Sequence, residues 1–138
     1  MIGRLNHVGV ATPSIEESIR LYRDILGATS IGVPFDLPSQ GVRVCFVDLV
    51  NSQIELIEPL GEASPIHKFL ARHPAGGQHH VCFEVESIEA AAAEMRAKGA
   101  AVLGAPRLGA HGTPVIFVAP KDMGGLLVEL MESPAAPH

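Results

Sequence analysis

The sequence predicts an α+β fold in which a β-α-β-β-β module occurs twice. Matching stretches recur at a nearly constant offset, each copy has a helical segment that a serine can cap and a glycine can end, and a pair of apolar strand-like runs follows each helix. A chain of 138 residues with 47% apolar content can bury one hydrophobic core. We therefore expect a single domain over 1–138, made of two modules at about 1–58 and 77–132 and a linker at 59–76.

The repeat is clearest where each module begins. The stretch NHVGVA at 6–11 matches HHVCFE at 79–84, which aligns His7 with His80. The glycines expected to end the two helices, Gly27 and Gly99, are separated by almost the same length of chain as the two histidines. A drift of one position is ordinary where loops differ in length, so the two halves are read as copies of one unit.

The helix expected in each module has a recognisable start and stop. Ser14 can accept hydrogen bonds from the first-turn N–H groups, and Glu17 at the third position after it completes a capping-box pattern. The second helix has Ser87 as its cap but no glutamate at the matching position. Gly27 and Gly99 provide the stops.

Two strand pairs complete the modules. Alternating apolar runs at 42–47 and 53–58 predict an antiparallel pair in the first module. The runs at 114–118 and 126–131, separated by a turn rich in glycine, predict the same pair in the second. The linker is expected to contain a short helical piece near 67–71.

Four residues at matched positions of the two modules form a set of potential metal ligands. His7 matches His80, and Glu55 matches Glu129 at nearly the same offset. An approximate twofold axis between the modules would place them on opposite walls of one cavity. Two imidazoles and two carboxylates suit a borderline divalent ion such as Co²⁺, Ni²⁺, Zn²⁺, Mn²⁺ or Fe²⁺.

The adjacent histidines at 79 and 80 cannot both reach that ion, because neighbouring side chains on a strand point to opposite faces. Val81, Phe83 and Val85 share the face of His79, which favours packing. Parity and the repeat both select His80 as the ligand. A single strand histidine is more often structural than a ligand, but four matched positions favour a metal.

Composition excludes several other classes. A net charge of −5 without a basic cluster argues against nucleic acid as a partner. No apolar run reaches membrane-spanning length, and no signal peptide is recognisable, so we expect a protein of the cytoplasm that does not bind membranes. Cys45 and Cys82 each lie inside an apolar run, which predicts buried free thiols and a reducing compartment.

The chain resembles the vicinal oxygen chelate (glyoxalase-like) superfamily along nearly its whole length, and within it the methylmalonyl-CoA epimerases. Three stretches carry the likeness: LNHVGVA at 5–11, GGQHHV at 76–81, and the longer run that begins GAHGTPVIF at 109–117 and continues through Lys121 and Asp122 to Glu129. The last stretch is the most specific of the three. The resemblance implies paired β-α-β-β-β modules that form a metal-containing cavity.

The resemblance also implies an activity. The epimerases interconvert (2R)- and (2S)-methylmalonyl-CoA by removing the α-proton on one face and returning a proton on the other, through an enolate. It implies an acyl-CoA substrate, a homodimer and a divalent ion, with Co²⁺ preferred over Zn²⁺, Ni²⁺ or Mn²⁺. In this chain the metal ligands would be His7, Glu55, His80 and Glu129, and we hypothesise that Glu129 and Glu55 also transfer the protons.

Coenzyme A brings phosphate groups that call for lysine or arginine. The candidates are Lys68, Arg72, Arg107 and Lys121, although each of these is more often a solvated surface charge.

Other members of the superfamily provide the rival interpretations. A glyoxalase I-like lactoylglutathione lyase would use the same four ligands, but the long match at 109–130 favours the epimerases. A metal-free ligand-binding protein would not need the four residues. Extradiol dioxygenases and fosfomycin-modifying enzymes normally have two histidines and one glutamate as ligands, so Glu55 would be an extra one.

Overall fold

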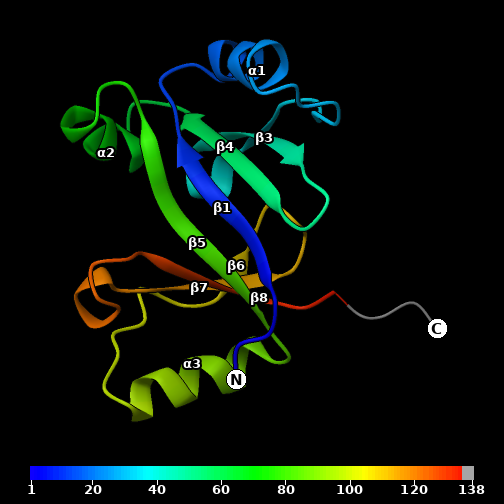
Figure 1. The fold of residues 1–138 in the computed structure, drawn as a ribbon. Helices are drawn as coiled ribbons and strands as arrows, with labels where there is room; N and C mark the ends of the chain where they lie inside the picture. The colour runs from blue at the N-terminus through cyan, green and yellow to red at the C-terminus, as the bar shows by residue number, and fades with distance from the viewer. Residues whose placement is uncertain (135–138) are drawn as a thin grey trace. The chain divides into compact units, whose positions relative to one another are not determined.

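A computed structural model describes residues 1–134 of the chain (Figure 1). The chain divides into two compact units. The N-terminal unit consists of residues 7–79, and the C-terminal unit consists of residues 1–6 together with the described residues from 80 to 134. No helix within the described residues is long and apolar enough to cross a bilayer.

The N-terminal unit contains a four-stranded sheet in the order β2-β3-β4-β1. β3 is antiparallel to both of its neighbours, and β1 runs parallel to β4. Helix α1 packs against β4, and so does α2. The elements are β1 (Leu5–Ala11), α1 (Ile15–Asp24), β2 (Phe35–Leu37), a 3-10 turn (Pro38–Gln40), β3 (Val42–Asp48), β4 (Gln53–Pro59) and α2 (Ile66–Arg72).

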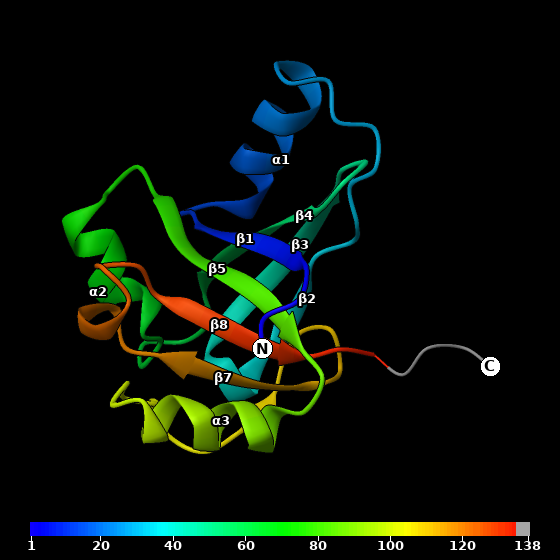
Figure 2. The same cartoon turned by 60° about the horizontal axis from the view of Figure 1, so that its bottom comes forward.

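The C-terminal unit repeats this arrangement in the order β5-β8-β7-β6, with β5 parallel to β8. Helix α3 packs on β7 and β8 (Figure 2). The elements are β5 (Gly77–Val85), α3 (Ile88–Ala97), β6 (Arg107–Leu108), β7 (Pro114–Val118), a 3-10 turn (Pro120–Asp122) and β8 (Val128–Glu132). The predicted α+β fold with a duplicated β-α-β-β-β order is confirmed. The short strands β2 and β6 were not located from the sequence.

The first residues of the chain are held by Glu84 of β5. The backbone N–H of Gly3 donates to the carbonyl of Glu84 at 2.7 Å, and the N–H of Glu84 donates to the carbonyl of Arg4 at 3.0 Å. The Glu84 carboxylate accepts from Asn6 Nδ2 at 3.0 Å and from Ser133 Oγ at 3.3 Å. These contacts explain why residues 1–6 belong to the C-terminal unit.

The core beneath α1 shows which side chains of its sheet face the helix. Ile15 of the helix packs with Cys45, Val47 and Leu56, all fully buried. Because Leu56 faces α1, its neighbour Glu55 points to the other face. Cys45 and Cys82 are buried thiols outside any disulfide, as predicted, and burial raises the pKa of the Cys45 thiol.

The predicted serines are the N-caps of helices α1 and α3. Ser14 Oγ accepts from the N–H of Glu17, and Ser87 Oγ accepts from the N–H of Ala90, each at 3.2 Å. The capping box predicted at Ser14 is wrong in its second half. The Glu17 carboxylate accepts instead from Arg20 Nε at 3.1 Å and Nη2 at 2.8 Å, while the N–H of Ser14 donates to Thr12 Oγ1 at 3.1 Å. A charged partner one turn away outcompetes the backbone donor, which the threonine hydroxyl satisfies.

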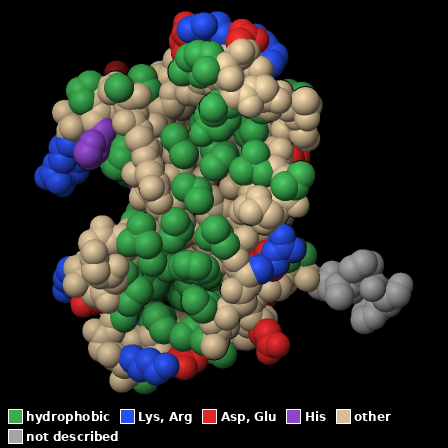
Figure 3. All heavy atoms as spheres, in the orientation of Figure 1, with side chains coloured by type: hydrophobic (Ala, Val, Ile, Leu, Met, Phe, Trp, Pro, Cys, Tyr) green, Lys and Arg blue, Asp and Glu red, His purple; other side chains and the backbone are tan. Residues whose placement is uncertain are grey.

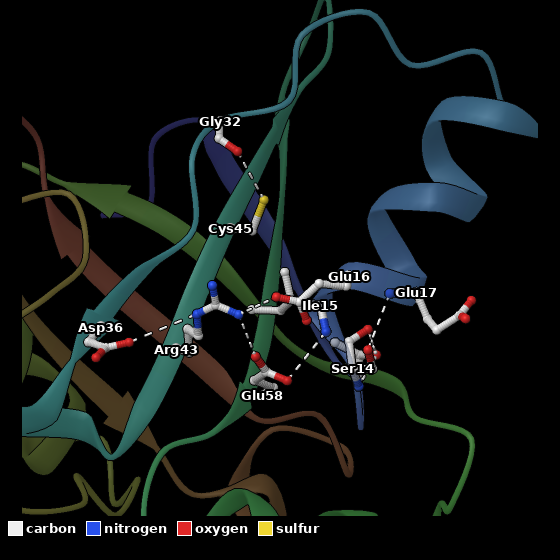
Figure 4. Close-up of polar contacts among 10 residues, drawn as sticks. Ser14, Ile15, Glu16, Glu17, Gly32, Asp36, Arg43, Cys45 and Glu58 are labelled. Atoms are coloured by element: carbon white, nitrogen blue, oxygen red, sulfur yellow. Dashed lines mark hydrogen bonds and ion pairs between the residues drawn. The ribbon is translucent and has the colours of Figure 1, made fainter.

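A carboxylate from the last long strand of each module reaches the start of its helix. Glu58 Oε2 accepts from the N–H of Ile15 at 3.3 Å, and Glu132 Oε1 accepts from the N–H of Ile88 at 3.0 Å. Arg43 Nη1 lies 3.1 Å from Glu58 Oε1 and also binds Glu16 (Figure 4). A negative charge at a helix N-terminus is favourable. The offset between Glu58 and Glu132 is the same as that between Glu55 and Glu129, so the repeat includes these capping carboxylates.

Replacing Glu132 with alanine should therefore remove a carboxylate cap from α3. We expect the free energy of unfolding to fall by about 1 kcal/mol, measured by urea denaturation. Glu94→Ala is the matched control, because Glu94 pairs with Lys98 on the exposed face of the same helix. Equal losses in the two variants would contradict a capping role for Glu132.

The backbone before β5 requires glycine at position 76. Gly76 has φ of +88°, and a Cβ there would collide with the backbone oxygen of Ala11. Gly61 has a similar φ of +81° but open space around it. Gly61→Ala should cost about 1 kcal/mol from backbone strain alone, and Gly76→Ala clearly more. Thermal unfolding of the two variants checks this, and equal shifts in melting temperature would show that the collision is relieved without cost.

Candidate functional site

The N-terminal unit brings His7 and Glu55 together. His7 lies on β1 and Glu55 on β4, and both side chains are buried. In the parallel β1–β4 register Glu55 is opposite Gly9, which has no side chain and lies on the same strand face as His7. The imidazole and the carboxylate share the space, with His7 Nε2 at 3.5 Å from Glu55 Oε2.

The C-terminal unit brings His80 and Glu129 together in the same way. His80 lies on β5 and Glu129 on β8, and Cys82 takes the register position that corresponds to Gly9. His80 Nε2 is 3.5 Å from Glu129 Oε1, and the two side chains are 3% and 6% exposed. Each module therefore carries one buried imidazole–carboxylate pair at equivalent positions.

The chemistry and spacing of each pair fit a divalent metal. A separation of 3.5 Å exceeds the roughly 2.7–3.2 Å of a strong N–H···O hydrogen bond. Two ligand atoms that each lie about 2.1 Å from one ion, at a tetrahedral angle, are about 3.4 Å apart. Imidazole nitrogen and carboxylate oxygen are both good ligands for borderline divalent ions. A cation would also offset the cost of burying the carboxylates.

A phenylalanine stands opposite each glutamate in the neighbouring antiparallel strand. Phe46 pairs with Glu55 in the β3–β4 register, and Phe117 pairs with Glu129 in the β7–β8 register. The Phe117 ring lies edge-on to the His80 ring, with centroids 5.9 Å apart and planes at 83°. Sequence reasoning did not single out these two phenylalanines, although their separation along the chain nearly follows the repeat.

His79 lies with a separate aromatic group. Its ring makes an edge contact with Phe69 of α2 at 5.1 Å, and Phe69 in turn packs on His73 at 4.6 Å. Since His79 and His80 are neighbours on β5, their side chains point to opposite faces. The contact with α2 is the packing role expected for His79.

Comparison with known proteins places the chain in a family. A sequence model described as the glyoxalase/bleomycin resistance protein/dioxygenase superfamily matches residues 6–117. The chain is 54% identical over 132 residues to the ethylmalonyl-CoA/methylmalonyl-CoA epimerase of Cereibacter sphaeroides, a match that covers 94% of this chain and 98% of the relative.

Solved structures of methylmalonyl-CoA epimerases have the same fold as this chain. A variant of the Streptomyces coelicolor methylmalonyl-CoA epimerase in complex with 2-nitronate-propionyl-CoA superimposes with a TM-score of 0.88 at 33% identity, covering 99% of this chain and 100% of that one. A methylmalonyl-CoA epimerase in complex with methylmalonyl-CoA and NH₄⁺ also gives a TM-score of 0.88 at 33% identity, covering 98% and 97%. The resemblance found in the sequence is confirmed: the chain belongs to the glyoxalase/bleomycin resistance protein/dioxygenase superfamily and has the vicinal oxygen chelate fold.

Proposed function

We propose that this protein is an epimerase that interconverts (2R)- and (2S)-methylmalonyl-CoA. The observation that carries the proposal is its 54% identity, over nearly the full length of both chains, to an ethylmalonyl-CoA/methylmalonyl-CoA epimerase. Each module of the chain also contains a buried histidine and a buried glutamate, at matched positions. Complexes of related epimerases with acyl-CoA ligands support coenzyme A thioesters as the substrate class.

His7, Glu55, His80 and Glu129 are the proposed ligands of one divalent ion. The equal 3.5 Å spacing of the two pairs and their burial support this assignment. When bound, such an ion supplies Lewis acidity that offsets the negative charge that develops as the α-proton leaves. Co²⁺ remains the preferred metal, ahead of Zn²⁺, Ni²⁺ and Mn²⁺.

Glu129 and Glu55 are the proposed proton-transfer residues. One carboxylate takes the α-proton from its face of the α-carbon and leaves the electron pair on the substrate as an enolate. The other, in its protonated form, returns a proton to the opposite face, which inverts the centre. The equivalent positions of the two glutamates in the repeated modules support a role on each face. The neighbouring imidazoles, each 3.5 Å away, orient the carboxylates.

The rival activity, glyoxalase I-like lactoylglutathione lyase, would use the same ligand types. The identity to an epimerase and the acyl-CoA complexes of structural relatives favour epimerisation over it. A homodimer and a cytoplasmic location remain part of the proposal. The buried thiols of Cys45 and Cys82 are compatible with a reducing compartment.

The activity is tested by incubating the metal-loaded protein with each single isomer of methylmalonyl-CoA in D₂O. Inversion together with α-deuterium incorporation is expected from both isomers. Turnover of the methylglyoxal–glutathione hemithioacetal without exchange of methylmalonyl-CoA would replace the proposed function by the lyase.

The two-glutamate mechanism predicts the behaviour of the amide variants. Glu55→Gln and Glu129→Gln keep an oxygen ligand but lose the basic carboxylate, so each should lower the rate of inversion by about 10²–10⁴-fold. Each variant should still exchange the α-proton of one isomer, and the two variants should prefer opposite isomers. If Glu55→Gln keeps its metal and inverts at the full rate, Glu55 is not a base.

The metal assignment separates the adjacent histidines. His80→Ala should abolish stoichiometric Co²⁺ binding, measured by titration calorimetry and elemental analysis. His79→Ala should bind one equivalent of Co²⁺ and show only a lower melting temperature, because it loses its packing against Phe69. Loss of the metal in both variants would show that His79 is also needed to form the site.

A further inference from the structure

Half of the lysine and arginine side chains in this protein form ion pairs with carboxylates. Five of its ten lysines and arginines form ion pairs: Arg4, Arg20, Arg23, Arg43 and Lys98. Within residues 1–134 the other five have no such partner, and they are Lys68, Arg72, Arg96, Arg107 and Lys121. Only Lys68 and Arg72 among these lie one turn apart on the same helix.

Lys68 and Arg72 form the exposed basic face of α2. The helix buries Ile66 and leaves both cations in solvent. The surrounding segment, residues 60–79, contains a single carboxylate, at Glu62, so its formal charge is +1 in a chain of −5. Figure 3 shows Lys or Arg atoms beside a histidine at the edge where α2 lies. Two like charges at this spacing repel each other, which disfavours the helix unless an anion offsets them.

The basic face is fixed in relation to β5. Phe69, which lies between the two cations in sequence, makes the edge contact with His79 at 5.1 Å and packs on His73 at 4.6 Å. His79 directly precedes the proposed ligand His80 in the chain. The cations are therefore carried by an element that is packed on the strand leading into the proposed metal site.

We propose that Lys68 and Arg72 bind the phosphate groups of the acyl-CoA substrate. The inference rests on the proposed epimerase function and adds to it a binding site for the part of the substrate farthest from the reacting carbon. Methylmalonyl-CoA is strongly anionic and this protein has a formal net charge of −5, so a local positive surface would offset part of the repulsion between them. Lysine and arginine are the usual partners of phosphate, arginine as a fork and lysine as a point charge.

The test compares two substrates that differ in their phosphates. The double variant Lys68→Ala/Arg72→Ala should raise KM for methylmalonyl-CoA by about tenfold and leave kcat unchanged. With methylmalonyl-pantetheine, which has no phosphate, its kinetics should equal those of the unmodified protein. The charge-conserving variant Lys68→Arg/Arg72→Lys keeps both positive charges, so its KM should stay close to that of the unmodified protein.

The matched control is Arg20→Ala/Arg23→Ala, which removes the same charge from the exposed face of α1 in the same unit. An equal rise in KM in this control would overturn the inference, as would an unchanged KM in the α2 variant or equal losses with both substrates.

Direct binding of 3′,5′-ADP, measured by titration calorimetry, separates this inference from the proposed function. Binding that weakens in the α2 variant but not in the control would support the phosphate site, even if the protein failed to epimerise either substrate. Equal binding of 3′,5′-ADP to all variants would refute it.

Discussion

A buried carboxylate beside a buried imidazole is the constraint on which the architecture depends. Glu55 and Glu129 lie on strands whose neighbouring positions are apolar, and burying an uncompensated charge there would cost several kcal/mol. The cost is acceptable only if each carboxylate has a partner at a fixed distance. Strand pairing supplies that distance, since the parallel registers of β1 with β4 and β5 with β8 set the 3.5 Å separations.

Much of the fold was predictable because duplication makes each half a test of the other. Strand parity assigned His79 and His80 to opposite faces of their strand. The matching offsets between the two halves located helices α1 and α3 and all the long strands. The short strands β2 and β6 escaped prediction because two or three residues carry no periodic signal. The capping box failed for a different reason, which is that Glu17 has an arginine one turn away.

The candidate site was predictable in its residue types but not in all of its supporting contacts. Two histidines and two glutamates stand out in sequence because each pair recurs at the repeat spacing. Phe46 and Phe117, and the capping carboxylates Glu58 and Glu132, recur in the same way but carry no chemistry that would draw attention to them. Their roles depend on cross-strand register and helix entry angle, which follow from tertiary packing.

Because residues 1–6 pack with the C-terminal unit, the two sequence modules do not coincide with the two compact units. A chain cut in the linker, between residues 59 and 76, would carry these residues away on the first fragment. The second fragment would then keep the Glu84 carboxylate but lose the donor of Asn6 and the backbone pairing of Gly3 and Arg4. Neither fragment would contain all the residues of one compact unit. A circular permutant that joins the two original termini and opens the chain in the linker would keep residues 1–6 on the same fragment as their partners in the C-terminal unit.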